Sequence, residues 1–404
     1  MRVKQNTSKK FNLLQIRFFV TFICFNFPIF LVGPFCGLLY TSHGVPREQA
    51  AQIRIVFTIS NAIFSIFTGA FISKIGHQKS LALASIVSSL GNLFRYLGGI
   101  TNYYLASVFT GIGAALNKVV FNDFFLLEEP STNQPNSNVI FSENKSFFSF
   151  LISILVSPAG DYINENHGTE SLFLIACVIF VFVLIPIYIC FYTTAQQTKK
   201  DSNTSFTKVL FSIVKPKDIR LPLTVFMVTV YEVLPIILHG SFVAFFAGKK
   251  LPNGAISGIF NISKLIGIFV LPIISKFIPT KYIVSLYCAL LVLIDYLMAI
   301  WFNDKVTLLV LVIVSGAIDG GITSLLLNYQ KQYYEPEIRA AIMGTTQLTT
   351  SVLASFFLMI MRKYNSQQQL VKFDMWITVA LLIASLLFNF VGKEEKAKEK
   401  VKKE

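Results

Sequence analysis

The sequence is dominated by repeated blocks of predominantly apolar residues, each about 20 residues long, which is the length that crosses a bilayer as a helix. In hydrocarbon every backbone amide must find its partner within its own segment, so these blocks are predicted to be helices and not strands. Only 14% of the 404 residues are charged, whereas soluble globular proteins carry roughly a quarter. The sequence therefore predicts an all-α polytopic membrane protein.

Twelve such blocks can be placed along the chain. We expect transmembrane helices near 16–41, 52–73, 80–99, 103–127, 146–164, 171–193, 221–247, 254–275, 282–301, 306–328, 340–361 and 372–391. The five cysteines lie in apolar segments without metal-ligand spacing, and neither a phosphate-binding loop nor a hydrolase triad is present. We therefore predict no bound metal, no cofactor and no enzymatic activity.

The polar, basic segment 194–220 divides the chain after six spans, with six still to come. The two halves also show signs of an internal repeat, because Ile72-Ser73-Lys74 after span two recurs as Ile274-Ser275-Lys276 after span eight. This organisation predicts two pseudo-symmetric six-helix bundles. The expected parts are a cytosolic tail, an N-terminal bundle, a cytosolic central loop, a C-terminal bundle and a charged cytosolic tail, over 1–15, 16–193, 194–220, 221–391 and 392–404.

The distribution of Lys and Arg predicts the orientation of the chain. With both termini inside, the cytosolic segments hold these residues in an excess of about threefold over the outer loops, as the positive-inside rule requires. The net charge of +14 then faces anionic membrane lipids and needs no nucleic acid as a partner. The sequence leaves open whether the membrane is the plasma membrane or an internal one.

The loop Phe71–Leu81 carries a familiar motif. Gly69, Gly76 and Lys79 fit the pattern G-x-L-x-D-x-x-G-[RK]-[RK], while Ser73 stands in place of the Asp and His77-Gln78 replace the basic pair. Together with the six-plus-six organisation, this loop resembles the signature of the major facilitator superfamily. The resemblance implies a monomeric transporter that works by alternating access, its two bundles rocking about a central cavity.

A narrower resemblance begins at the end of span one. Gly33–Gly44 is similar to the G-P-Y-x-Y-x-L-Y-x-x-Y-G stretch of the eukaryotic molybdate-anion transporter family, and Tyr231-Glu232 falls where that family has Phe-Glu. This resemblance implies an inorganic oxyanion, such as molybdate, as the substrate. The family's G-R-x-x-G-G pattern on span four has Thr110 in place of Arg here. If that Arg serves the substrate, another residue must do so in this chain.

Charged residues inside the spans are the candidate binding residues, because a charge at mid-bilayer costs about 2.5–3.5 kcal/mol on insertion scales. Asp123 and Asp295 lie near span ends, where a solvated or capping role is expected. Arg95 lies near an outer end and can also extend towards water. The candidates for substrate binding are Lys118, Glu232, Lys264 and Asp319 near the middle of their spans, together with Arg95.

Two readings of Lys264 remain open. Its ammonium can face a polar cavity and attract an oxyanion, or it can form a structural ion pair with Glu232 or Asp319. These two carboxyls are also candidate proton carriers, which would make the proton a coupling ion. Beside Asp319, Gly316, Gly320 and Gly321 permit either a moving gate or tight helix packing. We assign a conformational role to these three and to Gly69, Gly76 and Lys79.

The sequence thus predicts a secondary active transporter of a small anionic solute. A transporter of a sugar or another small polar metabolite is the second interpretation. A transporter-like sensor or scaffold that moves nothing is the third.

Overall fold

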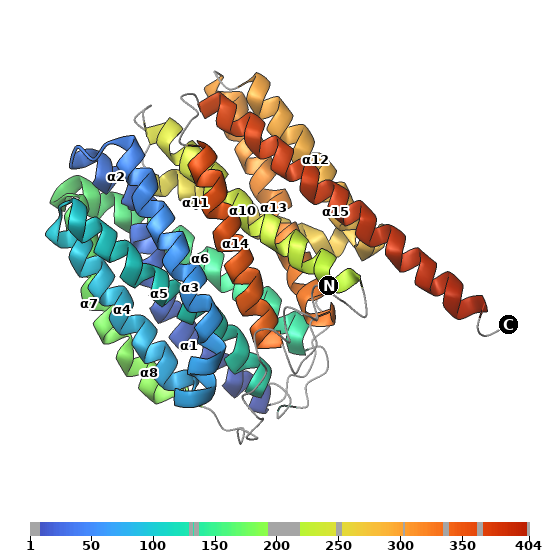
Figure 1. Cartoon of the computed structure of the whole chain (residues 1–404), viewed down its shortest axis with the longest axis horizontal. Coiled ribbons are helices and arrows are strands. Elements are labelled where there is room, and N and C mark those ends of the chain that lie inside the picture. Colours follow the sequence, from blue (N-terminus) through green and yellow to red (C-terminus); the bar gives the residue numbers. More distant parts are fainter. Residues whose placement is uncertain are drawn as a thin grey trace. The chain divides into compact units, whose positions relative to one another are not determined.

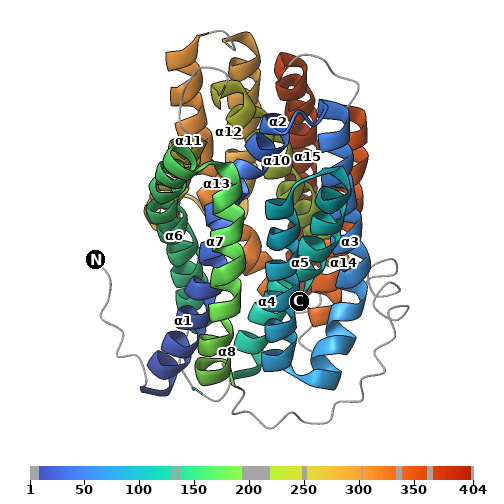
Figure 2. The ribbon, with the colours of Figure 1, turned by 90° about the vertical axis from the view of Figure 1, so that its left-hand side faces the viewer.

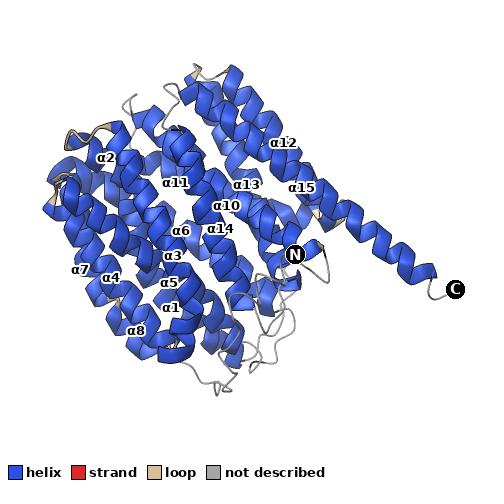
Figure 3. Ribbon diagram, in the orientation of Figure 1, coloured by secondary structure: helices blue, strands red, loops and turns tan. Residues whose placement is uncertain are grey.

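The computed structural model describes residues 9–128, 132, 137–192, 219–247, 253–301, 304–333, 339–361 and 367–401. Every secondary-structure element in these residues is a helix (Figure 3). The chain forms two compact units, Met1–Thr204 and Ser205–Glu404, referred to below as the N-terminal unit and the C-terminal unit. Of the central loop expected at 194–220, residues 194–218 lie outside the described residues.

The N-terminal unit contains the first six expected spans (Figure 1). The first span is broken at Gly33-Pro34, where a short 3-10 turn follows the first helix, and the sixth span is broken near Val183. The elements are α1 (Lys9–Val32), η1 (Gly33–Phe35), α2 (Cys36–Ser42), α3 (Arg47–Ile75), α4 (His77–Leu97), α5 (Ile100–Glu128), α6 (Ser137–His167), α7 (Thr169–Phe182) and α8 (Leu184–Cys190).

The C-terminal unit contains the other six, which are α10 (Arg220–Ala247), α11 (Asn253–Ile274), α12 (Thr280–Ile300), α13 (Lys305–Tyr333), α14 (Arg339–Met361) and α15 (Gln367–Val401). All twelve expected spans therefore fall on helices. In the part of the chain that is described, nine segments have by themselves the length and apolar character needed to cross a membrane.

The same order of packing occurs in each unit. In the N-terminal unit α4 packs against α5 and α7, α3 against α5, and α1 against α6 and α7, as Figures 1 and 2 both show. In the C-terminal unit α12 packs against α13 and α15, α11 against α13, and α10 against α14 and α15. When the spans are numbered one to six within each unit, span three packs against four and six, span two against four, and span one against five and six in both units. This agreement is what two pseudo-equivalent six-helix bundles require.

The cores of the two units differ in composition. The N-terminal unit buries interlocking phenylalanine rings, such as Phe18 against Phe121 and Phe25 against Phe180, with ring centroids 5.3 and 5.4 Å apart in edge-to-face geometry. The C-terminal core is mostly aliphatic, with Ile283, Met298 and Leu381 fully buried. Edge-to-face ring pairs contribute about 0.5–1.5 kcal/mol beyond the area that they bury.

Glycines bring α11 and α13 into backbone contact. A Cβ added at Gly320 would lie 2.0 Å from the backbone oxygen of Lys264, and one at Gly267 would lie 1.8 Å from that of Ala317. No side chain fits at either distance, so glycine is required at both positions. The close approach places Lys264 of α11 directly beside the stretch of α13 that carries Asp319.

Candidate functional site

Lys264 and Asp319 form an ion pair across α11 and α13. The Lys264 ammonium contacts Oδ2 of Asp319, and the two side chains are 13% and 10% exposed. The ammonium also lies 4.7 Å from the ring centroid of Phe260, one turn earlier on α11. Of the two interpretations of Lys264, the structure contains the ion pair. The positive charge of this side chain is therefore already compensated within its own unit.

Tyr231 of α10 completes this cluster, and the sequence interpretation assigned it no role. Its hydroxyl donates to Oδ1 of Asp319, lies 2.9 Å from the Asp319 carbonyl oxygen and is within hydrogen-bonding distance of the Thr323 hydroxyl. A buried tyrosine hydroxyl usually has a hydrogen-bond partner. This rule could have indicated from the sequence that Tyr231, inside a span and directly before Glu232, bonds a polar group of another helix.

The glycines beside Asp319 pack against neighbouring helices. A Cβ at Gly316 would lie 2.9 Å from Cβ of Ser263, and one at Gly321 would lie 2.3 Å from the ring of Tyr287. Together with Gly320, they therefore serve close packing, which was the second of the two interpretations. Whether they also act as a gate stays a prediction.

Glu232, the other candidate carboxyl of this unit, faces α14. Thr350 donates a hydrogen bond of 3.3 Å to Oε2 of Glu232, and one turn away the Thr229 and Thr349 hydroxyls are 2.9 Å apart. Glu232 is partly buried. The structure thus places Lys264, Asp319 and Glu232 in one unit, on α11, α13 and α10, with Tyr231 between the helices.

Arg95 forms a second polar site, in the N-terminal unit. The residue is 8% exposed, so its side chain is buried among α2, α5 and α7. Nη2 donates to the Thr110 hydroxyl of α5 at 3.2 Å, the guanidinium lies beside Tyr40 of α2, and Cζ lies 5.7 Å from the ring centroid of Phe173 on α7. Thr110 is the position at which the molybdate-anion family pattern has an Arg. A guanidinium therefore reaches this position from α4.

The surroundings of Arg95 supply hydrogen-bond acceptors but no negative charge. Thr110 donates its own proton to the Ala106 carbonyl at 2.7 Å, which leaves its oxygen lone pairs to accept from Arg95. Among the described residues no carboxylate forms an ion pair with Arg95, and its Nε has no hydrogen-bond partner. The Glu170 carboxylate, in the first turn of α7, pairs with His43 at 3.2 Å. Arg95 is a buried cation whose charge is not compensated within the described chain.

The remaining candidate cation, Lys118 of α5, has an exposed side chain. The structure does not bring Lys118, Arg95 and Lys264 together in one unit, because the first two belong to the N-terminal unit and the third to the C-terminal unit. Lys79 is also exposed.

The loop that resembles the superfamily signature is built around Gly76. This residue has a φ of 84°, which favours glycine, and it joins α3 to α4. Nε2 of His77 lies 2.9 Å from Oδ2 of Asp123 on α5, and the Gln78 amide donates to the carbonyls of Ile187 and Tyr188 at 3.2 and 3.1 Å. The two residues that replace the usual basic pair thus tie the start of α4 to α5 and α8. Asp123, expected to be solvated or capping, is instead the partner of His77.

The expectation for Asp295 was wrong. This residue is only 1% exposed, and Thr378 of α15 donates a hydrogen bond of 2.8 Å to its Oδ2. Asp374 of α15, which the sequence interpretation missed, is fully buried as well. Side chains near span ends are usually in contact with water, so the position of Asp295 near the end of α12 suggested a solvated side chain.

Comparisons with known proteins bear on these features. The sequence profile described as "Major Facilitator Superfamily" matches residues 18–359. No curated protein matches the sequence. Among solved structures, the crystal structure of a mutant form of the nucleoside transporter NupG is similar with a TM-score of 0.69 and 14% identity, over 94% of this chain and 100% of that one. The profile covers most of the chain, and the chain belongs to the major facilitator superfamily, as an integral multi-pass membrane protein.

Proposed function

We propose that this superfamily transporter moves a small inorganic oxyanion across its membrane by alternating access, with Arg95 as the residue that binds the anion. The observation that supports this most is the buried guanidinium of Arg95, with hydrogen-bonding neighbours but no carboxylate among the described residues. An ion taken out of water without a counter-charge costs several kcal/mol. An anion that binds there recovers part of that cost.

The geometry of the guanidinium suits an oxyanion. Its Nε and Nη donors form a planar fork that can hold two oxygens of one anion. Nη2 is occupied by Thr110, whereas Nε has no partner in the described chain. Lys264 is less suited to this role, because its ammonium already contacts the Asp319 carboxylate. We therefore assign anion binding to Arg95 and not to Lys264. The ion pair of Lys264 with Asp319 instead holds α11 and α13 together.

The resemblance to the molybdate-anion transporter family implies molybdate as the anion to test first. A neutral polar solute, such as a sugar or a nucleoside, is the competing substrate class. A protein that senses or scaffolds and transports nothing is the remaining alternative.

The experiment is uptake of labelled molybdate, sulfate and a neutral nucleoside into liposomes that contain the purified full chain. We expect saturable uptake of an oxyanion by the wild type. Arg95→Gln should lower uptake at subsaturating anion by about 10–100-fold, which corresponds to the 1.5–3 kcal/mol of a charged hydrogen bond. Arg95→Lys keeps the charge and loses the fork, so an intermediate effect is expected.

The matched control is Lys74→Gln, which removes an exposed positive charge from α3 of the same unit and should leave uptake unchanged. Uptake of the nucleoside that is insensitive to Arg95→Gln would replace the oxyanion with a neutral substrate. Absence of flux for all three solutes, in protein shown to be folded, would favour the sensor.

A further inference from the structure

Two buried carboxyl groups lie opposite each other on α12 and α15, away from the Lys264–Asp319 pair. Asp295 of α12 is 1% exposed and Asp374 of α15 is 0% exposed. The two helices pack directly against each other in the C-terminal unit. Thr378, one turn after Asp374 on α15, donates a hydrogen bond to the Asp295 carboxyl, so Asp295 faces the segment of α15 that carries Asp374. Two acidic side chains thus share one apolar environment.

These carboxyls have far fewer hydrogen-bond donors than acceptor atoms. Thr378 donates to Oδ2 of Asp295 at 2.8 Å, and the same hydroxyl also lies 3.2 Å from the backbone oxygen of Asp374. Oδ1 of Asp295 and both carboxyl oxygens of Asp374 have no hydrogen-bond partner in the described structure. A buried acceptor without a donor costs about 1–3 kcal/mol, and more if it is charged.

No cation compensates the pair within the described residues. Lys372 lies two residues before Asp374 but has an exposed side chain. The other ionisable groups of the packed helices have partners elsewhere. Glu232 bonds Thr350, Asp319 bonds Lys264 and Tyr231, Arg220 lies over the Tyr333 ring, and Cys288 interacts with Ser385. The remaining ionisable side chains that the structure describes within these helices are tyrosines, none of which is negatively charged at neutral pH, namely Tyr282, Tyr287, Tyr296 and Tyr329.

Two neighbouring carboxylates in an apolar environment cannot both stay ionised. We infer that Asp295 and Asp374 form a proton-binding site, in which one proton is shared between the two carboxyl groups. The proton comes from water, and the resulting O–H donates to an oxygen of the opposite carboxylate, so that the site carries one negative charge and not two. Thr378 donates to the same pair and stabilises the remaining charge.

A proton suits this site better than a metal ion. Hard cations such as Mg²⁺ and Ca²⁺ take six or more oxygen ligands, which exceeds what two carboxyls and one hydroxyl supply. Within the described part of the chain there is also no cluster of three or more potential metal-ligating side chains.

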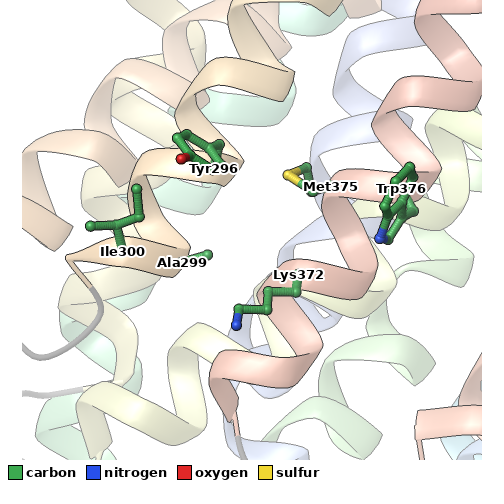
Figure 4. Close-up of a pocket in the computed structure, with 6 residues that line it drawn as sticks. All are labelled: Tyr296, Ala299, Ile300, Lys372, Met375 and Trp376. Carbon is green, nitrogen blue, oxygen red and sulfur yellow. The ribbon is translucent and has the colours of Figure 1, made fainter.

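A cavity of about 320 Å³ lies between α12 and α15, at the end of the helix pair that carries Asp295 and Asp374 (Figure 4). Tyr296 and Met375, which directly follow the two aspartates in the sequence, line it together with Ala299, Ile300, Lys372 and Trp376. Lys372 and Met375 lie on the side of α15 that faces α12. Lys372 and Trp376 are exposed, so this end of the helix pair lies at the surface of the unit.

The test is infrared spectroscopy of the full chain in lipid, which detects the carbonyl stretch of a protonated carboxyl group directly. We expect this band at neutral pH in the wild type and its loss in both Asp295→Asn and Asp374→Asn, because the new amide donates to the remaining carboxylate. Asp304→Asn is the matched control. Asp304 is exposed, and its hydrogen bond from Thr307 holds the pKa of its carboxyl below the usual value, so it contributes no such band at neutral pH.

Absence of the band in the wild type, or its persistence in both variants, would overturn the proton site. Loss of the wild-type band on adding Na⁺ at fixed pH would also overturn it, in favour of a metal ion. The role of the site in coupling rests on the proposed transport function. A pH gradient should stimulate oxyanion uptake several-fold in the wild type and not in Asp374→Asn, while exchange without a gradient is retained. A band without any uptake would refute only the transport function, and uptake without a band would refute only the proton site.

Discussion

Nη2 of Arg95 donates a hydrogen bond of 3.2 Å to the Thr110 hydroxyl, which fixes a guanidinium of α4 against α5. Because Thr110 uses its own proton on the Ala106 carbonyl, it can only accept from Arg95. The arrangement orients the guanidinium while leaving its charge uncompensated by any carboxylate in the described residues. The hydrogen bond brings an arginine of span three to the Thr110 position of span four.

Thr110→Val should weaken anion binding without abolishing it. The substitution keeps the side-chain shape and removes the acceptor, so Arg95 loses its orienting partner but not its charge. A hydrogen bond to a charged group contributes about 1.5–3 kcal/mol, so we expect KM for the oxyanion to rise by at least tenfold. The measurement is concentration-dependent uptake. Thr41→Val, at an exposed hydroxyl that bonds the Gly37 carbonyl, should leave KM unchanged, and an unchanged KM in Thr110→Val would contradict the orienting role.

Replacing Lys264 alone should destabilise the protein strongly. Lys264→Met leaves the Asp319 carboxylate buried without its cation, and removal of one partner from a buried pair costs about 3–5 kcal/mol. The double variant Lys264→Met, Asp319→Leu removes both charges and should recover most of the lost thermal stability. Thermal unfolding in detergent measures both. If the double variant unfolds at the same temperature as Lys264→Met or at a lower one, the ion pair is not the main role of Lys264.

Gly320→Ala should force α11 and α13 apart. The added methyl would meet the Lys264 carbonyl at 2.0 Å, which is backbone and cannot rotate away. Overpacking of this kind costs about 1–3 kcal/mol, so the unfolding temperature should fall. Gly37→Ala is the control, because a Cβ there meets no heavy atom within 4 Å. Equal unfolding temperatures for the two variants would show that the close approach is not required.

The proposed orientation, with both termini in the cytosol, predicts which cysteines can be labelled from each side. Lys74 lies in the last turn of α3 and Asp304 directly before α13, and both are exposed. In a background without the native cysteines, Lys74→Cys should react with an impermeant thiol reagent only from the cytosolic side. Asp304→Cys should react only from the opposite side. The reverse pattern would invert the topology.

Much of the fold could be predicted because hydropathy and span length are properties of the local sequence. A chain in hydrocarbon has few alternatives to helices, and so each expected span fell on a helix. The interruption at Gly33-Pro34 was harder to predict, because proline can occupy the first turn of a helix as readily as it can end a span.

The sites were only partly predictable. Lys264 and Asp319 were visible because charges are rare in apolar blocks, but their pairing depends on the backbone approach at Gly267 and Gly320, which no local pattern encodes. Tyr231 and Thr110 were missed as partners because each acts across helices. Asp295 and Asp374 were misjudged or missed because the distance to a span end does not report which face of the helix a side chain occupies.

The central claim is that Arg95 binds an anion, and equilibrium binding of labelled molybdate and sulfate to the purified protein tests it most directly. The account predicts saturable binding of one oxyanion by the wild type, weakened by about tenfold or more in Arg95→Gln and unaffected in Lys74→Gln. Equal affinities in the wild type and Arg95→Gln, with both proteins folded, would contradict it.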